Sequence, residues 1–124
     1  MTKPRPVFFN PLRIQLPVGA LTSIMHRVTG LILALGMPLG AYLLDLSLRG
    51  PEGYARVVSL LGALPSRIAA VALAWALSHH LLAGIRHLLS DIDVGSGLYA
   101  ARRSAWIVNT SGLAIAVLAA GALL

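Results

Sequence analysis

The sequence has few of the residues that a soluble domain exposes to water. Charged residues make up 11% of its 124 positions, and only four residues are acidic, whereas a soluble domain carries about 25% charged residues. Cysteine is absent, which excludes an iron–sulfur cluster held by thiolates of this chain and a haem attached through cysteine. No linker, low-complexity tract or internal repeat interrupts the sequence, so we expect a single domain over residues 1–124.

Apolar residues fill most of what remains. They account for 57% of the chain, and the mean hydropathy is +0.81, which is typical of a membrane protein. Three segments, at about 18–48, 67–90 and 104–124, are apolar over the roughly 20 residues needed to cross a bilayer. Pro38 lies inside the first, but membrane helices tolerate proline between helix neighbours. The sequence therefore predicts an all-α membrane protein with three transmembrane helices in a helical bundle.

The loop between the first two segments is itself partly apolar. Val57, Leu60, Leu61 and Leu64 recur there at helical spacing. This pattern favours a segment that lies along the outer membrane surface. Asp45, at the end of the preceding apolar run, is expected to be solvated.

Basic residues lie at the ends of the apolar segments. The net charge is +6, but Lys and Arg are not clustered with aromatic residues, so we expect a lipid bilayer as partner and no nucleic acid. Seven of the ten basic residues lie on one side of the three spans, which predicts a cytoplasmic N-terminus and a C-terminus outside. These seven are Lys3, Arg5, Arg13, Arg27, Arg86, Arg102 and Arg103, and the other three are Arg49, Arg56 and Arg67.

A histidine stripe ends the second apolar segment. His80, Gly84 and His87 follow one another at i, i+4 and i+7, so a missing side chain separates two imidazoles on one helix face. A b-type haem fits this pattern, with iron on the deeper imidazole and its propionates held about 10 Å away by Arg86 and His87. A histidine satisfied by a neighbouring helix, or one that reaches to the interface, fits equally well.

A second polar group begins the first apolar segment, in the stretch SIMHRVTG from Ser23 to Gly30. Ser23 lies at i−3 from His26 and at i−4 from Arg27, so the three side chains share neighbouring faces at the headgroup boundary. A quinone requires hydrogen-bond donors for its carbonyl oxygens and an apolar path for its tail, which this location offers. The alternative is a positive-inside anchor that contacts lipid phosphate.

The order and spacing of these groups are more specific than either alone. Arg-Pro near the N-terminus, then Ser-x-x-His-Arg-x-Thr-Gly, then His-x-x-x-Gly-x-Arg-His-x-x-x-Asp on the second span follow one another in the chain. In this, the chain resembles the cytochrome b subunit, or large membrane anchor, of succinate dehydrogenase (respiratory complex II). The resemblance covers nearly the whole sequence. Its motifs lie at Arg5–Val7, at Ser23–Gly30, and at His80, Gly84, Arg86, His87 and Asp91.

The resemblance implies a role for each motif residue. His80 matches the axial ligand of haem b iron, with the second ligand supplied by a histidine of a second, smaller membrane-anchor subunit. Ser23 and Arg27 match residues of the quinone site beside the iron–sulfur subunit. The positions that match residues near the haem propionates are His26, Arg27, Arg86 and His87.

The resemblance also implies an assembly and a location. A flavoprotein subunit oxidises succinate, an iron–sulfur subunit carries the electrons, and ubiquinone or menaquinone is reduced at the anchor, which lies in the bacterial cytoplasmic (inner) membrane. His79 departs from the family pattern at the position before the ligand. Because it points about 100° away from His80 on a helix, the spacing to Gly84 and His87 favours His80 as the ligand.

Two other functions remain compatible with the sequence. A haem-free structural anchor of a membrane dehydrogenase requires the same spans without the iron ligand. A small transporter subunit requires charges near the midplane of its spans, and the third segment has none.

Overall fold

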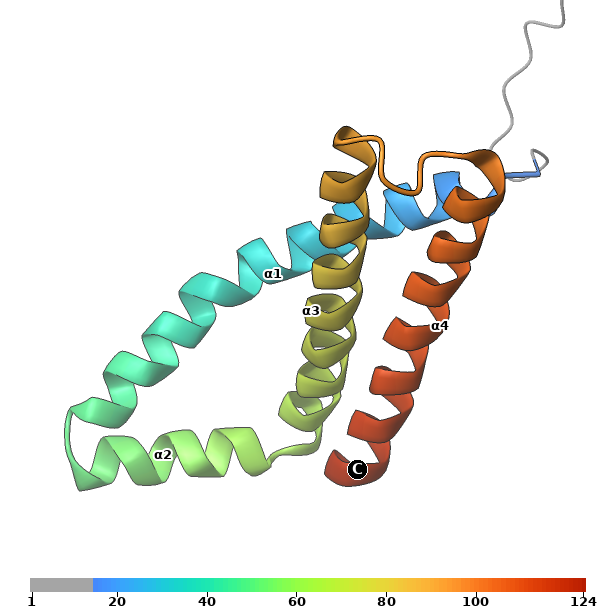
Figure 1. The fold of residues 1–124 in the computed structure, drawn as a ribbon. Coiled ribbons are helices and arrows are strands. Elements are labelled where there is room, and N and C mark those ends of the chain that lie inside the picture. The colour runs from blue at the N-terminus through green and yellow to red at the C-terminus, as the bar shows by residue number, and fades with distance from the viewer. Residues whose placement is uncertain (1–14) are drawn as a thin grey trace, which may run out of the picture.

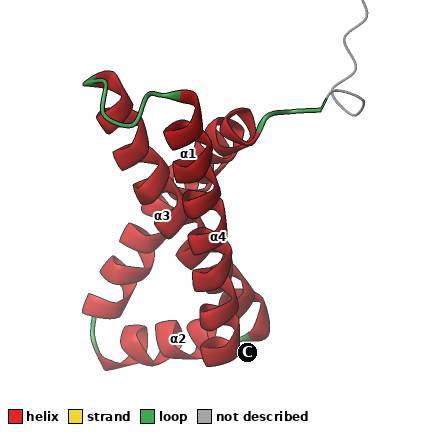
Figure 2. Ribbon diagram, turned by 45° about the vertical axis from the view of Figure 1, so that its right-hand side comes forward, coloured by secondary structure: helices red, strands yellow, loops and turns green. Residues whose placement is uncertain are grey.

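The computed structural model describes residues 15–124, so the Arg5–Val7 motif lies outside the described residues. The described chain is entirely helical and contains no strand. Four helices follow in order (Figures 1 and 2). They are α1 (Val18–Leu48), α2 (Pro51–Gly62), α3 (Leu64–Asp91) and α4 (Leu98–Leu123).

Three of these helices are long and apolar enough to cross a membrane. They are α1, α3 and α4, and they occupy the segments expected to be spans. The all-α class with three candidate spans is therefore confirmed. Helix α1 begins after Pro17, whose extended backbone precedes the first turn, and it continues through Pro38 without interruption, as the membrane setting allows.

The segment between the first two candidate spans forms the helix α2. Pro51 occupies its first turn, together with Glu52, where an acidic side chain complements the helix dipole. Gly50 makes the turn into α2 with φ of 134°, a backbone conformation that favours glycine. Gly53 then packs so closely on α1 that an added Cβ would meet the backbone oxygen of Leu46. Glycine thus permits the sharp corner between α1 and α2.

The helices converge at one end and separate at the other. The start of α1, the end of α3 and the start of α4 lie together, which we call the histidine end; the opposite end, where α2 connects α1 to α3, is the α2 end (Figure 1). Helix α1 crosses behind α3 near the histidine end and then diverges from it toward α2 (Figures 1 and 2). Its distant half is consequently exposed, with Leu44 at 61% and Leu48 at 77%.

Small and polar residues, rather than large apolar ones, fill the interior. Ala76, Ala83 and Ala105 are fully buried, and the largest side chains in the same state are His79, Thr22 and Thr29. Small residues let membrane helices approach closely. Large apolar side chains need not be buried between the helices, because lipid is as apolar as leucine. The three buried polar residues lie in or beside the candidate site described below.

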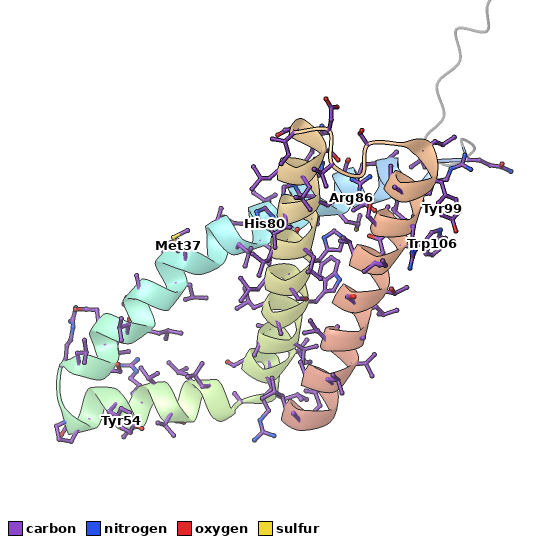
Figure 3. The ribbon with its side chains drawn as sticks, in the orientation of Figure 1. Met37, Tyr54, His80, Arg86, Tyr99 and Trp106 are labelled. Atoms are coloured by element: carbon purple, nitrogen blue, oxygen red, sulfur yellow. The ribbon has the colours of Figure 1, made fainter. Side chains whose placement is uncertain are left out.

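Large apolar and aromatic side chains point outward instead. Trp106 on α4 is exposed and projects away from the bundle, as does Tyr99 near the start of the same helix (Figure 3). Tryptophan and tyrosine favour membrane interfaces, where their rings combine apolar area with a polar group.

Candidate functional site

Three imidazoles form a stack where α1 crosses α3. His26 of α1 lies between His80 and His87 of α3, with ring centroids 4.1 Å from the first and 5.0 Å from the second. The rings are inclined by only 19° and 24°. The two motifs that the sequence placed at one end of the chain's spans therefore meet side by side.

His80 is held by its Nδ1 atom. This nitrogen lies 3.1 Å from the backbone oxygen of His26 and 3.4 Å from Oγ1 of Thr29. A carbonyl oxygen only accepts, so Nδ1 of His80 carries the proton and donates it to His26. In this tautomer Nε2 keeps its lone pair, as in histidines that bind a metal through one nitrogen and donate from the other.

Gly30 makes room for the His80 ring. A Cβ added at Gly30 would lie 2.9 Å from Cε1 and 3.3 Å from Nδ1 of His80, closer than such atoms pack. The glycine that ends the SIMHRVTG motif thus allows the imidazole to rest against the α1 backbone. Sequence reasoning included Gly30 in the motif but gave it no role.

Gly84 faces His26. A Cβ at Gly84 would lie 3.6 Å from Nε2 of His26, so the gap in the histidine stripe receives an imidazole from α1. Within residues 15–124, Nε2 of His26 is buried without a hydrogen-bond partner. The gap at Gly84 between His80 and His87 is thus occupied by the imidazole of His26.

His87 forms one side of the stack, and the quinone candidates precede and follow His26 in α1. His87 donates from Nδ1 to the backbone oxygen of Ala83 at 2.7 Å, which leaves its Nε2 with a lone pair. Ser23 is half-buried and Arg27 is exposed, on either side of His26 in α1. A hydroxyl and a guanidinium thus lie within about one helical turn of the stack.

Arg86 points away from the imidazoles. Its Nε donates to Oγ of Ser104 at 3.0 Å and its Nη2 to the backbone oxygen of Ala101 at 3.3 Å, both on α4. The same guanidinium lies 3.7 Å from the position of a Cβ on Gly19. The structure therefore does not bring Arg86 to the stack of His26, His80 and His87; it joins the ends of α1, α3 and α4.

His79 faces α4 rather than α1. It is 1% exposed, and its Nε2 lies 3.0 Å from Oδ1 of Asn109. Thr22 of α1 contacts the same amide oxygen at 3.2 Å. Sequence reasoning missed Asn109 and Thr22, although a polar residue in the middle of an apolar span is a signal.

The donor set at His80 fits a haem better than a bare metal ion. Within residues 15–124, no three His, Asp or Glu side chains converge to bind a metal. An imidazole nitrogen is a common donor to haem iron, and Nε2 of His80 would be the donor here, because Nδ1 is engaged with α1. The half-buried imidazoles of His26 and His87 add polar groups beside it.

Comparison with known proteins identifies the family of the chain. Over residues 1–123 the sequence matches the family described as succinate dehydrogenase/fumarate reductase transmembrane subunit. Three relatives bear the name succinate dehydrogenase cytochrome b556 subunit. The one from Paracoccus denitrificans is 34% identical over 104 residues, which cover 84% of this chain and 80% of the relative. The one from Coxiella burnetii is 34% identical over 122 residues, 96% of both chains. The one from Rickettsia felis is 30% identical over 104 residues, 84% of this chain and 81% of the relative.

Proposed function

The chain belongs to the succinate dehydrogenase/fumarate reductase transmembrane subunit family, and from that premise we propose that it is the cytochrome b anchor of a succinate:quinone oxidoreductase. Its proposed partners are a flavoprotein subunit, an iron–sulfur subunit and a second, smaller membrane anchor. Succinate loses two electrons and two protons in the flavoprotein, and quinone gains two of each at the membrane. This chain supplies residues for the second event.

His80 carries the proposal. Its Nδ1–H bond to the backbone of His26 fixes the ring and leaves Nε2 able to bind the iron of a b-type haem. A histidine of the smaller anchor subunit is the proposed second ligand. A bound haem would supply a reversible one-electron acceptor.

Basic side chains at the histidine end are the proposed partners of the haem propionates. His26 stacks on the ring of His80, and His87 stacks on the other side of His26. Arg27 follows His26 on α1. Arg86 adds positive charge to this end while its guanidinium remains bonded to α4. Charge-assisted bonds to carboxylates are the strongest that such groups form.

Ser23 and Arg27 are the proposed quinone-binding residues. The Ser23 hydroxyl donates to one carbonyl oxygen, and the exposed guanidinium of Arg27 places positive charge where negative charge develops as the quinone is reduced. Their location near the start of α1 is also where the iron–sulfur subunit would dock. Ubiquinone and menaquinone present the same carbonyl pair to these residues.

The proposed orientation follows from the two ends of the bundle. Arg27, Arg86 and Arg102 belong to the histidine end, whereas Arg49 and Arg67 belong to the α2 end. The more basic end faces the cytoplasm in the proposed bacterial cytoplasmic membrane, so the N-terminus is inside and the C-terminus outside.

A reduced-minus-oxidised spectrum of the complex purified through this chain tests the haem assignment. We expect a b-type α-band that is lost in His80→Ala and kept in Leu81→Ala, because the Leu81 side chain is exposed on the next position of α3. A parent complex without the band, but with succinate-to-quinone activity, would establish a haem-free structural anchor instead. Failure of flavin and iron–sulfur subunits to copurify would favour a transporter subunit.

Paired activity assays test the quinone assignment. Arg27→Leu is expected to depress quinone reduction about a hundredfold, which is typical of losing one electrostatic stabiliser, while succinate oxidation by a soluble dye continues. Arg103→Leu removes another exposed arginine from the histidine end and serves as the control. Equal loss of both activities in Arg27→Leu would indicate failed assembly, whereas quinone reduction equal to that of Arg103→Leu would refute the assignment.

A further inference from the structure

A buried polar cluster joins the three long helices beside the imidazole stack. Thr22 of α1 and His79 of α3 both contact Oδ1 of Asn109 on α4, at 3.2 Å and 3.0 Å. Thr22 is 0% and His79 is 1% exposed. The proposed function uses none of these three residues.

The cluster gives the two adjacent histidines opposite tautomers. Oδ1 of Asn109 accepts, so Nε2 of His79 carries a proton and donates to it. His80 instead carries its proton on Nδ1, which donates to the backbone of His26. Nε2 is therefore engaged in a hydrogen bond in His79, whereas His80 is bonded through Nδ1 and keeps the lone pair of its Nε2.

Apolar packing alone does not fix how α3 is turned about its axis. Exposed apolar side chains lie along it at Leu77, Leu81, Ile85 and Leu88, and lipid solvates one apolar face as well as another. A specific rotation therefore depends on polar bonds and on close contacts with small residues.

Contacts made by two neighbouring residues of α3 fix this rotation. On one side, His79 bonds to Asn109, and its Cβ lies 3.2 Å from the position of a Cβ on Gly112 of α4. On the other side, the His80 ring rests on Gly30 of α1. Successive residues point about 100° apart, so holding His79 toward α4 directs His80 toward α1.

We infer that Asn109 is a positioning residue for His80: by accepting a hydrogen bond from His79, it holds α3 in the rotation that presents His80 to α1. The inference deepens the proposed function, since it assigns a role relative to the proposed iron ligand. The rotation itself, however, is a property of this chain and is measurable without haem.

A disulfide cross-link measures the rotation. Leu73 precedes His80 by seven residues and shares its face of α3, and a Cβ on Gly36 of α1 would lie 3.1 Å from Cδ2 of Leu73. Because this chain contains no cysteine, the pair Gly36→Cys and Leu73→Cys can form only one disulfide within it. Oxidation of this pair in the assembled complex gives a rate that falls when the face turns away.

Asn109→Leu is the variant to compare with Thr110→Leu. Thr110 is exposed on the adjacent position of α4, and its hydroxyl bonds only within its own helix. We expect Asn109→Leu to slow cross-linking about three- to twentyfold, as the loss of an interhelical hydrogen bond in a membrane suggests, and Thr110→Leu to leave it unchanged. His79→Leu removes the same hydrogen bond from the α3 side and should slow cross-linking equally. It therefore tests the inference even if Asn109→Leu fails to assemble.

The haem provides the second measurement. In complexes with equal haem content, Asn109→Leu is expected to shift or split the electron paramagnetic resonance signal of the oxidised haem, which responds to ligand orientation, whereas Thr110→Leu keeps the parent signal. Cross-linking rates in both His79→Leu and Asn109→Leu that equal the Thr110→Leu rate would overturn the inference. So would an unshifted haem signal in Asn109→Leu. A parent complex without haem would instead refute the proposed function and leave the cross-linking result to decide the inference on rotation.

Discussion

The two ends of the α1–α3 pair belong to the same apolar helices but differ in how closely they pack. At the histidine end, α1 approaches α3 so closely that Gly30 has no room for a Cβ against His80. Toward the α2 end, Gly40 on the same helix has no atom within 4 Å of such a Cβ. Both glycines lie in one apolar helix of 31 residues, yet only one of them is required for a contact.

Polar and small residues, rather than hydropathy, therefore decide where these membrane helices touch. Thr29 and His26 lie on α1 where it meets α3, whereas the diverging half of α1 carries exposed leucines and Met37. Since lipid accepts leucine from any direction, apolar side chains leave helix contacts unspecified. Hydrogen bonds and glycine specify them.

The largest expected effect comes from filling the contact at the histidine end. Gly30→Ala forces the His80 ring from its seat, at a cost of about 1–3 kcal/mol for overpacking, and the haem content of the purified complex should fall several-fold. Gly40→Ala adds the same methyl group where nothing lies within 4 Å, and it should keep the parent haem content. Equal haem content in the two variants would contradict the contrast between the ends.

An intermediate effect is expected at the corner between α1 and α2. Gly53→Ala places a Cβ against the backbone oxygen of Leu46, so α2 must separate from α1, and we expect stability to fall by about 1–3 kcal/mol. The haem α-band should stay at the parent wavelength, because His80 lies away from this corner (Figure 3).

Thermal unfolding followed by circular dichroism in detergent measures this effect. Gly62→Ala is the matched control, because Gly62 ends the same helix with nothing within 4 Å of an added Cβ. Alanine is the better helix former, so this control should unfold at the parent temperature or slightly above it. A displaced α-band in Gly53→Ala would mean that the two ends are coupled.

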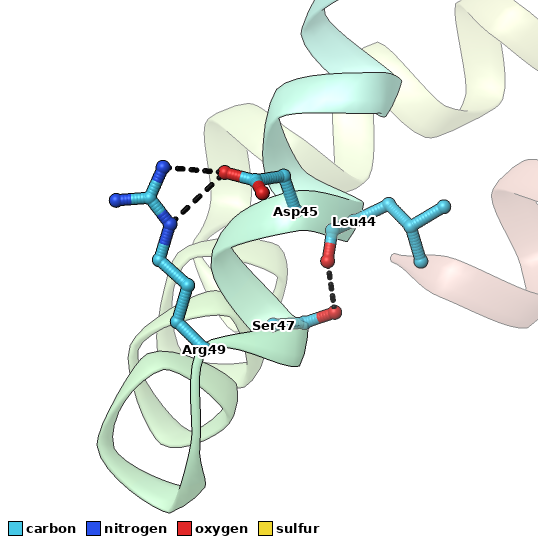
Figure 4. A network of polar contacts seen from close by, with 4 residues as sticks. All are labelled: Leu44, Asp45, Ser47 and Arg49. Carbon is cyan, nitrogen blue, oxygen red and sulfur yellow. Dashed lines mark hydrogen bonds and ion pairs between the residues drawn. The ribbon is translucent and has the colours of Figure 1, made fainter.

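The smallest effect is expected from the ion pair at the α2 end. Arg49 donates to Oδ2 of Asp45 from Nη2 at 2.6 Å and from Nε at 3.0 Å, and the two side chains are 67% and 59% exposed (Figure 4). Exposed pairs at i, i+4 contribute about 0.3–0.5 kcal/mol. Asp45→Asn should lower stability by about that amount in dilute buffer, and added salt should reduce the difference. A salt-independent loss, or one as large as that of Gly53→Ala, would show that the pair is not a solvated surface contact.

Most of the fold follows from the sequence, because span length and hydropathy are local properties. The predicted first span, 18–48, coincides with α1, whereas α4 begins at Leu98 rather than near 104. The difference arises because Arg102 and Arg103 lower the local hydropathy without ending the helix. Helical spacing in the loop also indicated the segment that forms α2.

The site is only partly encoded in local pattern. The two histidine motifs indicated that His26 and His80 would share one side of the membrane, and the rings are stacked. That the gap at Gly84 faces His26, and that Arg86 bonds to Ser104, depends on how the helices cross. No periodicity in one chain segment reports such a crossing. The same reason explains why Asn109 was missed.

The crossing of α1 over α3 also makes α1 a lever. Gly36 lies in close contact with Leu73 of α3. Leu48, at the far end of α1, is 12 residues further along the helix, or roughly 18 Å at the helical rise. A change of about 10° in the crossing angle would therefore carry that end of α1 by roughly 3 Å, and α2 would follow through Gly50 and Gly53. Small changes in the crossing angle near the imidazole stack thus produce larger displacements at the α2 end. The distance between α1 and α3 at that end therefore varies most with the crossing angle.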